Sequence, residues 1–158
     1  MGKVSTCLWY EKGGEAAARF YTSLIPNSRI DSVVPFKADS PSGRQGETML
    51  VDFTLDGQKY QALNGGPYYT MSPAASISVL TDDQAETDRL WDALLEGGSA
   101  MQCGWLTDRW GLSWQIVPRR LLEIMNDPDP EKARRGVEAM MKQIKIDIAE
   151  IERAAAGA

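Results

Sequence analysis

Short apolar stretches separated by glycine and proline predict a strand, a helix and three further strands in the first part of the chain. Ala17, Phe20, Tyr21 and Leu24 recur at the spacing of one helical face. Asp56-Gly57 is a hairpin turn signal between two strand-like stretches. The expected elements are a strand over 4–10, a helix over 15–25, and strands over 30–36, 47–55 and 58–64.

The same order of elements is predicted a second time after a connection rich in glycine and proline. Asp83 and Glu86 have the spacing of a capping box, and Gly97-Gly98 is a typical helix end. The expected strands cover 76–80, 100–103, 105–108 and 112–118, with the helix between the first two.

Two heptapeptides support the repeat directly. Residues 57–63 read Gly-Gln-Lys-Tyr-Gln-Ala-Leu, and residues 111–117 read Gly-Leu-Ser-Trp-Gln-Ile-Val. In both, a glutamine stands four residues after the glycine and directly after an aromatic residue. Two copies of one strand indicate two copies of one module.

A helical extension is predicted to end the chain. After a short helical turn at 121–125, Asp129 is a good N-cap and Pro130 suits the first helical position of one long helix over 130–155. Its apolar seam packs either on its own domain or on a second copy of the chain. The seam residues are Val137, Met141, Ile144, Ile148, Ile151 and Ala155.

Composition places the chain among ordinary globular proteins. With 158 residues, 43% hydrophobic and 25% charged, it suits one compact domain whose parts are residues 1–66, 67–120 and 121–158. The net charge of -5 disfavours a nucleic-acid partner and mildly favours neutral or cationic ligands. No apolar run is long enough to span a membrane, and the first residues lack the apolar core of a signal peptide, so a cytoplasmic location without a membrane partner is expected.

The chemistry-bearing residues are few. The chain has no histidine, which removes the commonest metal ligand and acid–base group. Cys7 and Cys103 are isolated, and both are predicted to be buried and reduced.

A set of short segments, taken together and in order, carries a resemblance to a known family: 7–10, 20–21, 25–28, 63–67, 103–106, 111–118 and 127–130. They resemble the vicinal oxygen chelate superfamily, which includes glyoxalase I, extradiol dioxygenases and bleomycin-resistance proteins. They look closest to its PhnB-like branch, often labelled 3-demethylubiquinone-9 3-methyltransferase. The resemblance implies an α+β fold of two βαβββ modules with cupped mixed sheets, and a homodimer.

The resemblance also implies where a metal would be bound. The superfamily's metal enzymes place ligands on the first and last strand of each module, and the corresponding positions are Thr6 (give or take one residue), Gln61, Ser76 and Gln115. All four are neutral. Neutral hydroxyls and amides are poor ligands for transition metals without a histidine or carboxylate beside them, so neither a metal nor another cofactor is expected.

Strand alternation predicts which side chains face the cup. With Thr6 as reference, Tyr10 faces the cup while Cys7 and Trp9 face the helix; with Gln115 as reference, Trp114 faces the core. Core packing is expected for Trp9 and Trp114, with stacking on a ligand as the alternative. Asn64 is expected first to satisfy a turn and alternatively to contact a ligand. The predicted ligand-binding set is Thr6, Tyr10, Gln61, Leu63, Asn64, Ser76, Ser78, Ser113 and Gln115.

Acid–base chemistry falls to carboxylates, lysine, tyrosine or cysteine. Glu47, at the start of a strand, is a weak catalytic candidate whose alternative is a solvated strand end. Asp52 is expected to point outward, and Asp108 and Arg109 to pair on the surface of a tight turn.

The favoured function is metal-free binding of a small, largely apolar or aromatic organic molecule in the cup. One alternative is an enzyme of the same superfamily (a lyase, isomerase, dioxygenase or the labelled methyltransferase), and another is an interaction module assembled through the C-terminal seam. Methyl transfer is disfavoured because Gly13-Gly14 is only a glycine pair and the order of elements is not alternating βαβ.

Overall fold

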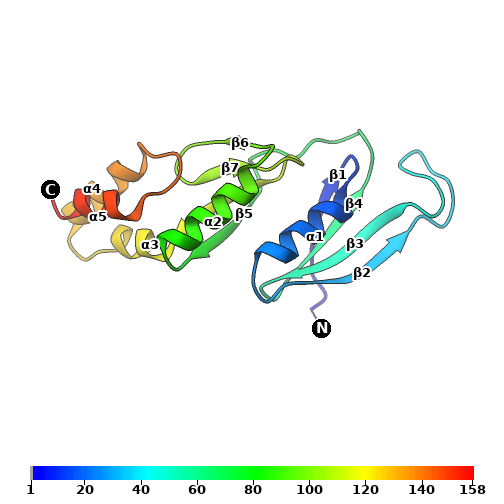
Figure 1. Cartoon of the computed structure of the whole chain (residues 1–158), viewed down its shortest axis with the longest axis horizontal. Coiled ribbons are helices and arrows are strands. Elements are labelled where there is room, and N and C mark those ends of the chain that lie inside the picture. The colour runs from blue at the N-terminus through cyan, green and yellow to red at the C-terminus, as the bar shows by residue number, and fades with distance from the viewer. Residues whose placement is uncertain (1) are drawn as a thin grey trace. The chain divides into compact units, whose positions relative to one another are not determined.

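The computed structural model describes residues 2–158, which divide into two compact units: one ends at Met71 and the other begins at Ser72. Each unit contains one four-stranded mixed sheet with one helix against it (Figure 1). Together they give the predicted α+β fold of two βαβββ modules.

The first unit follows the predicted order closely. The sheet order is β1-β4-β3-β2, with β1 parallel to β4 and the other neighbours antiparallel. The elements are β1 (Thr6–Tyr10), α1 (Gly14–Leu24), β2 (Arg29–Pro35), β3 (Thr48–Leu55) and β4 (Gln58–Asn64).

Its core lies between α1 and one face of the sheet. Tyr21 of α1 is fully buried, and its ring centroid lies 6.3 Å from that of Phe53 on β3. The hydroxyl of Tyr10 donates to that of Tyr21 at 3.1 Å, so two buried phenols satisfy each other.

A distant side chain holds the start of α1. The N-cap residue Gly13 has no side chain to cap the helix; instead, Asn64 at the end of β4 accepts from the backbone N–H of Gly14 at 2.8 Å and donates to the carbonyl of Thr48 at 3.0 Å. A β-carbon at residue 14 would lie 2.8 Å from Asn64 Oδ1, which explains the glycine there. The primary role of Asn64 is therefore structural.

The second unit repeats the plan with a locally capped helix. The sheet order is β5-β8-β7-β6, and Asp83 accepts from the backbone N–H of Glu86 at 2.8 Å, as the capping-box spacing predicts. The elements are β5 (Ser76–Thr81), α2 (Gln84–Leu95), β6 (Ser99–Ala100), β7 (Trp105–Thr107) and β8 (Ser113–Pro118).

Asp108 is buried, and does not lie on the surface as its turn suggested. It is 3% exposed and accepts from the backbone N–H groups of Trp110 and Leu112 and from Trp114 Nε1 at 2.9 Å. Three donors compensate the burial of one carboxylate, so Asp108 organises the β7–β8 turn and anchors the buried Trp114.

The prediction of one helix over 130–155 is wrong. The structure has α3 (Arg119–Met125), α4 (Pro130–Met140) and α5 (Ile148–Ala155), with a loop between the last two (Figure 1). Of the proposed seam, Met141 and Ile144 are 54% and 55% exposed in that loop, whereas Ile146, outside the seam, is fully buried. The chain turns because Asp147 starts a new helix by accepting from the backbone N–H of Glu150.

The loop between α4 and α5 fastens this extension to the second unit. Backbone N–H groups of Cys103 and Gly104 donate to the carbonyls of Gln143 and Ile144, both at 2.8 Å. The side-chain amide of Gln84, in the first turn of α2, donates to the carbonyl of Ile146 and accepts from the N–H of Ile148. The predicted extension is thus part of the second unit.

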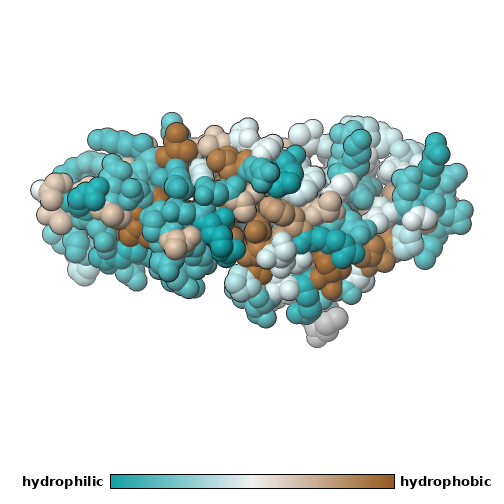
Figure 2. Space-filling model, viewed as in Figure 1, coloured by the Kyte–Doolittle hydropathy of each residue, from teal (hydrophilic) through white to brown (hydrophobic). Residues whose placement is uncertain are grey.

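The helical extension has a largely hydrophilic surface and an apolar interior. Its visible surface is mainly hydrophilic (Figure 2), while the buried side chains between α3, α4 and α5 form one apolar cluster. Within residues 2–158, none of the helices has the length and apolar character to cross a bilayer. The members of the cluster are Leu121, Ile124, Ile146, Ile151 and Ala155.

Candidate functional site

The candidate site lies on the open face of the first sheet, defined here as the face that α1 does not cover. Alternation places Val51, Phe53 and Ala62 under α1, all fully buried, and their neighbours along β3 and β4 on the open face. Cross-strand register arranges the open-face side chains in three rows that run across the strands.

The central row is polar and crosses all four strands: Cys7, Gln61, Asp52 and Ser32 are successive cross-strand neighbours. Gln61 Nε2 donates to Asp52 Oδ1 at 3.0 Å, and Ser32 Oγ donates to Asp52 Oδ2 at 2.8 Å. Loss of water around the Cys7 thiol, together with the negative charge of Asp52, raises the pKa of this cysteine. We call these four residues the polar row.

The next row is apolar, and we call it the apolar row: Trp9, Leu63, Leu50 and Val34. Trp9 is fixed from the side, because its Nε1 donates to the carbonyl of Gly66 at 2.9 Å and its ring meets that of Tyr69 edge-on at 4.9 Å. A β-carbon at Gly65 would lie 2.3 Å from the indole, so the glycine lets the chain pass directly against the ring. The indole is therefore held in one orientation on this face.

The third row is ionic. Asp31 accepts from Thr54 Oγ1 at 2.6 Å and from Lys59 Nζ at 3.1 Å, and pairs with Arg29 at 2.8 Å. Partial burial acts to raise the pKa of Asp31, but the hydrogen bonds from Thr54 and Lys59 and the charge of Arg29 outweigh it, so the pKa lies below its usual value. The two cations neutralise the carboxylate of Asp31 and leave this row with one excess positive charge.

The predicted orientation of β1 is wrong by one residue. Tyr10 is 2% exposed and Leu8 9%, both under α1, whereas Cys7 and Trp9 lie on the open face beside Gln61 and Leu63. A slip of one residue reverses every side chain of a strand. Cys7, not Thr6, is the β1 neighbour of Gln61, and Tyr10 belongs to the core; the prediction that Cys7 is buried is also wrong, since it is exposed.

On the second sheet, the predicted orientation is confirmed. Ile77, Val79, Trp114 and Ile116 share the face turned to α2, and the predicted residues Ser76, Ser78, Ser113 and Gln115 share the other. Gln115 Nε2 donates to Ser76 Oγ at 2.9 Å. Ser113 is 1% exposed, and its hydroxyl has no hydrogen-bond partner among residues 2–158.

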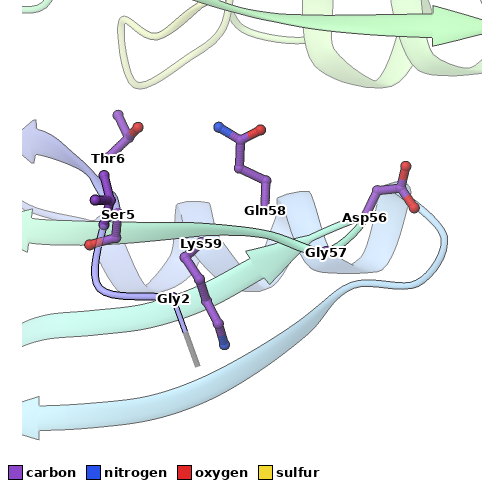
Figure 3. A pocket seen from close by; sticks show the side chains of 8 residues that line it. Gly2, Ser5, Thr6, Asp56, Gly57, Gln58 and Lys59 are labelled. Carbon is purple, nitrogen blue, oxygen red and sulfur yellow. The ribbon is translucent and has the colours of Figure 1, made fainter.

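A depression of about 610 Å³ lies at the start of β4, at the end of the strand away from Leu63 and the apolar row. It is lined by Gly2, Val4, Ser5 and Thr6 and by residues 56–59 around the β3–β4 turn. Thr6 and Gln58 extend in the same direction, whereas Lys59 extends the opposite way (Figure 3). Of the predicted ligand-binding residues, only Thr6 lines it, and Lys59 is four residues, roughly 13 Å, from the apolar row along β4.

Glu47, the weak catalytic candidate, is exposed just before β3, where its backbone carbonyl accepts from the N–H of Phe36 and its N–H donates to the carbonyl of Arg44. The carboxylates on the open face are instead Asp52 in the polar row and Asp31 in the ionic row. The alternation along β3 predicted the position of Asp52, because it stands between Val51 and Phe53, which both point to the core.

The residues at the metal positions of the superfamily do not fit a divalent ion. Gln61, Gln115 and Ser76 offer only neutral amide and hydroxyl oxygens, and Cys7 occupies the β1 position, where loss of water and the charge of Asp52 raise the pKa of its thiol and favour the neutral form. In the part of the chain that the structure describes, no three cysteine, aspartate or glutamate side chains come close enough to hold a metal. No step that needs a metal is derived for this site.

Two βαβββ units, each with a mixed sheet whose first strand is parallel to its last, define the vicinal oxygen chelate class of fold. The chain belongs to the 3-demethylubiquinone-9 3-methyltransferase family, whose family model matches residues 2–117. The predicted resemblance to the PhnB-like branch is thereby confirmed.

Solved structures agree with this assignment. The PhnB protein from Bacillus cereus is 30% identical, with 74% of this chain and 99% of that chain covered and a TM-score of 0.67. Protein PA1353 from Pseudomonas aeruginosa is 24% identical (75% and 98% covered, TM-score 0.61), and the fosfomycin resistance protein FosX from Listeria monocytogenes is 14% identical (80% and 98% covered, TM-score 0.54). The last two share the fold alone. None of the curated proteins matches the chain.

Proposed function

We propose that the chain binds a small organic molecule on the open face of the first sheet, without a metal. The observation that carries the proposal is the pair of adjacent rows: a polar row with hydrogen-bonding side chains next to an apolar row with one fixed indole. Apolar surface with a few well-placed polar groups is typical of sites for small ligands.

Each row has its own task in binding. Leu50, Leu63 and Trp9 provide apolar surface for the body of the ligand. Gln61 and Asp52 orient it, because Gln61 keeps its amide oxygen for a donor on the ligand while Asp52 fixes its amide nitrogen. Of the residues predicted to bind, Gln61 and Leu63 take part in this proposal, and Cys7 and Trp9 replace Thr6 and Tyr10.

The test is a ligand screen on the whole protein by ligand-observed NMR, followed by variants. Leu63→Ser is expected to weaken hits from the screen by about fivefold or more, since it removes apolar contact from the centre of the apolar row. Val33→Ser, on the same sheet but outside the three rows, is the matched control and should leave affinity unchanged. Hits that bind equally to both variants would place the site elsewhere and overturn the proposal.

Methyl transfer is the alternative that the family's name describes. The helix start behind the glycine pair, where such a cofactor would be expected, is already filled, because the N–H of Gly14 donates to Asn64. Calorimetric titration with S-adenosylmethionine tests this alternative: micromolar binding would favour it over simple ligand binding. The homodimer is likewise a proposal, and light scattering of the purified protein tests it.

A further inference from the structure

One carboxylate on the open face of the first sheet, that of Asp52, has no ion-pair partner among residues 2–158. Asp52 lies in the middle of the polar row, and no lysine or arginine of these residues forms an ion pair with it. Its two hydrogen-bond partners, Gln61 and Ser32, are neutral. The polar row therefore holds a carboxylate with no cation of the described residues in direct contact.

The neighbouring ionic row provides a comparison, because its aspartate, Asp31, does have cationic partners. Lys59 and Arg29 both approach Asp31, at 3.1 and 2.8 Å. The same sheet thus holds one aspartate with two cationic partners and one with none. A half-buried carboxylate without a cation is stabilised when a cationic ligand group reaches it.

The surroundings of Asp52 define the rest of the ligand. Two residues along β3 lead from Asp52 to Leu50, so the polar and apolar rows are about 7 Å apart. A ligand that covers both rows has an apolar or aromatic body over Leu50, Leu63 and Trp9, and a polar group about one row away. The net charge of -5 favours approach of such a ligand when it is positive.

We propose that the ligand of this face is an organic cation: an amine or quaternary ammonium whose positive nitrogen approaches Asp52 and whose apolar body lies on the apolar row. This assignment rests on the proposed function and adds the charge of the ligand to it. The pKa of the Cys7 thiol, raised first by burial and then by the negative charge of Asp52 two strands away, agrees with a carboxylate on this face.

Three probes of the same shape separate charge from apolar contact: 2-naphthylmethylammonium, 2-naphthylmethanol and 2-naphthoate. Their affinities for the whole protein are measured by calorimetry at low ionic strength, where charge contributions are largest. We expect the cation to bind at least about tenfold more tightly than the alcohol, and the anion more weakly than both.

Asp52→Asn then removes the charge while it keeps an oxygen that can accept hydrogen bonds. In this variant, we expect the affinity of the cation to fall about tenfold, to that of the alcohol, while the affinity of the alcohol stays the same. Asp56→Asn is the matched control: it changes the net charge equally, lies in the exposed β3–β4 turn, and asparagine tolerates its positive φ of 44°. It should leave all three affinities unchanged.

The outcomes separate the two proposals. If the alcohol binds as tightly as the cation, and Asp52→Asn changes neither, the organic-cation proposal is overturned while binding on this face stands. If Asp56→Asn weakens the cation as much as Asp52→Asn does, the effect is one of net charge and the assignment to Asp52 is wrong. If no probe binds and Leu63→Ser has no effect on any hit of the screen, both proposals fail.

Discussion

The two units share one strand plan but differ in what their open faces carry. The first has an aspartate without an ion pair, an ion-paired row and a tryptophan held against a glycine. On its first and last strands the second has Ser76, Ser78, Ser113 and Gln115, all neutral, and Trp105 stands opposite Gln115 as Asp52 stands opposite Gln61. A repeated backbone thus keeps the alternation that builds a core under each helix, while the face turned away from the helix is free to diverge.

The same contrast appears in how each helix begins. Asp83 caps α2 from the residue directly before it, whereas α1 depends on Asn64, which is 50 residues from Gly14 in the sequence. The N–H of Glu86, in the first turn of α2, is therefore satisfied without a side chain from the sheet. Capping across the fold makes α1 depend on β4 being in place.

The largest expected effect concerns the helical extension that only the second unit has. Ile146→Ala removes a fully buried side chain from the cluster between α3, α4 and α5, and is expected to cost about 2–5 kcal/mol of unfolding free energy. Urea denaturation followed by circular dichroism measures it. Ile144→Ala, 55% exposed and two residues away, should cost less than about 0.5 kcal/mol. Equal effects would mean that the extension does not contribute to a common core.

A smaller effect sharpens the comparison of helix starts. Asn64→Ala leaves the N–H of Gly14 and the carbonyl of Thr48 without their partner, and should cost about 1–3 kcal/mol. Asp83→Ala removes one local cap and should cost about 1 kcal/mol. Denaturation midpoints of the two variants decide the order, and a costlier Asp83→Ala would contradict the role given to Asn64.

Low pH should lower the stability that the ionic row of the first sheet contributes. The pKa of Asp31 is lower in the folded protein, so its contribution is complete above the unfolded pKa, near pH 4, and is lost as pH falls through the folded pKa. Because the row is partly exposed, we expect at most about 1 kcal/mol. Stability measured from pH 6 to pH 2.5 should fall less steeply in Asp31→Asn than in the unaltered protein. Parallel curves would show that Asp31 does not contribute to the pH dependence of stability.

The smallest expected effect tests the charge of Asp52 in the absence of a ligand, through the reactivity of Cys7. Its charge helps to raise the pKa of Cys7, so Asp52→Asn should increase the alkylation rate of Cys7 by iodoacetamide at pH 8 by a factor of roughly two. Mass spectrometry of the Cys7 peptide measures the rate, with the Cys103 peptide as internal reference. An unchanged rate would show that the charge does not reach the thiol.

Sequence patterns predicted the fold because the alternation and turn signals were strong where they were needed. Strand β5 reads Ser-Ile-Ser-Val, and that polar and apolar alternation assigns its faces without ambiguity. Strand β1 reads Thr-Cys-Leu-Trp-Tyr, in which four apolar residues follow one another. Such a strand carries no alternation, so its orientation was taken from spacing and was wrong by one residue.

The C-terminal turn was missed for the opposite reason. Apolar residues at spacings of four and three continue through the loop from Met141 to Ile148, and this favoured one helix. The residues Asp147 to Glu150 also have the Asp-x-x-Glu spacing of a helix start, and that local signal decided the structure. The contact between Asn64 and Gly14 has no local signal, because residues so far apart meet only in the folded sheet.

The attachment of the last helices sets an order of events during synthesis. The first sheet is complete once Asn64 has left the ribosome, since all four of its strands precede that point. The second unit draws Ile146, Ile151 and Ala155 into one cluster, so it can close only after Ala155 has left the ribosome. We therefore expect the nascent protein to hold a finished first unit while the second is still being translated.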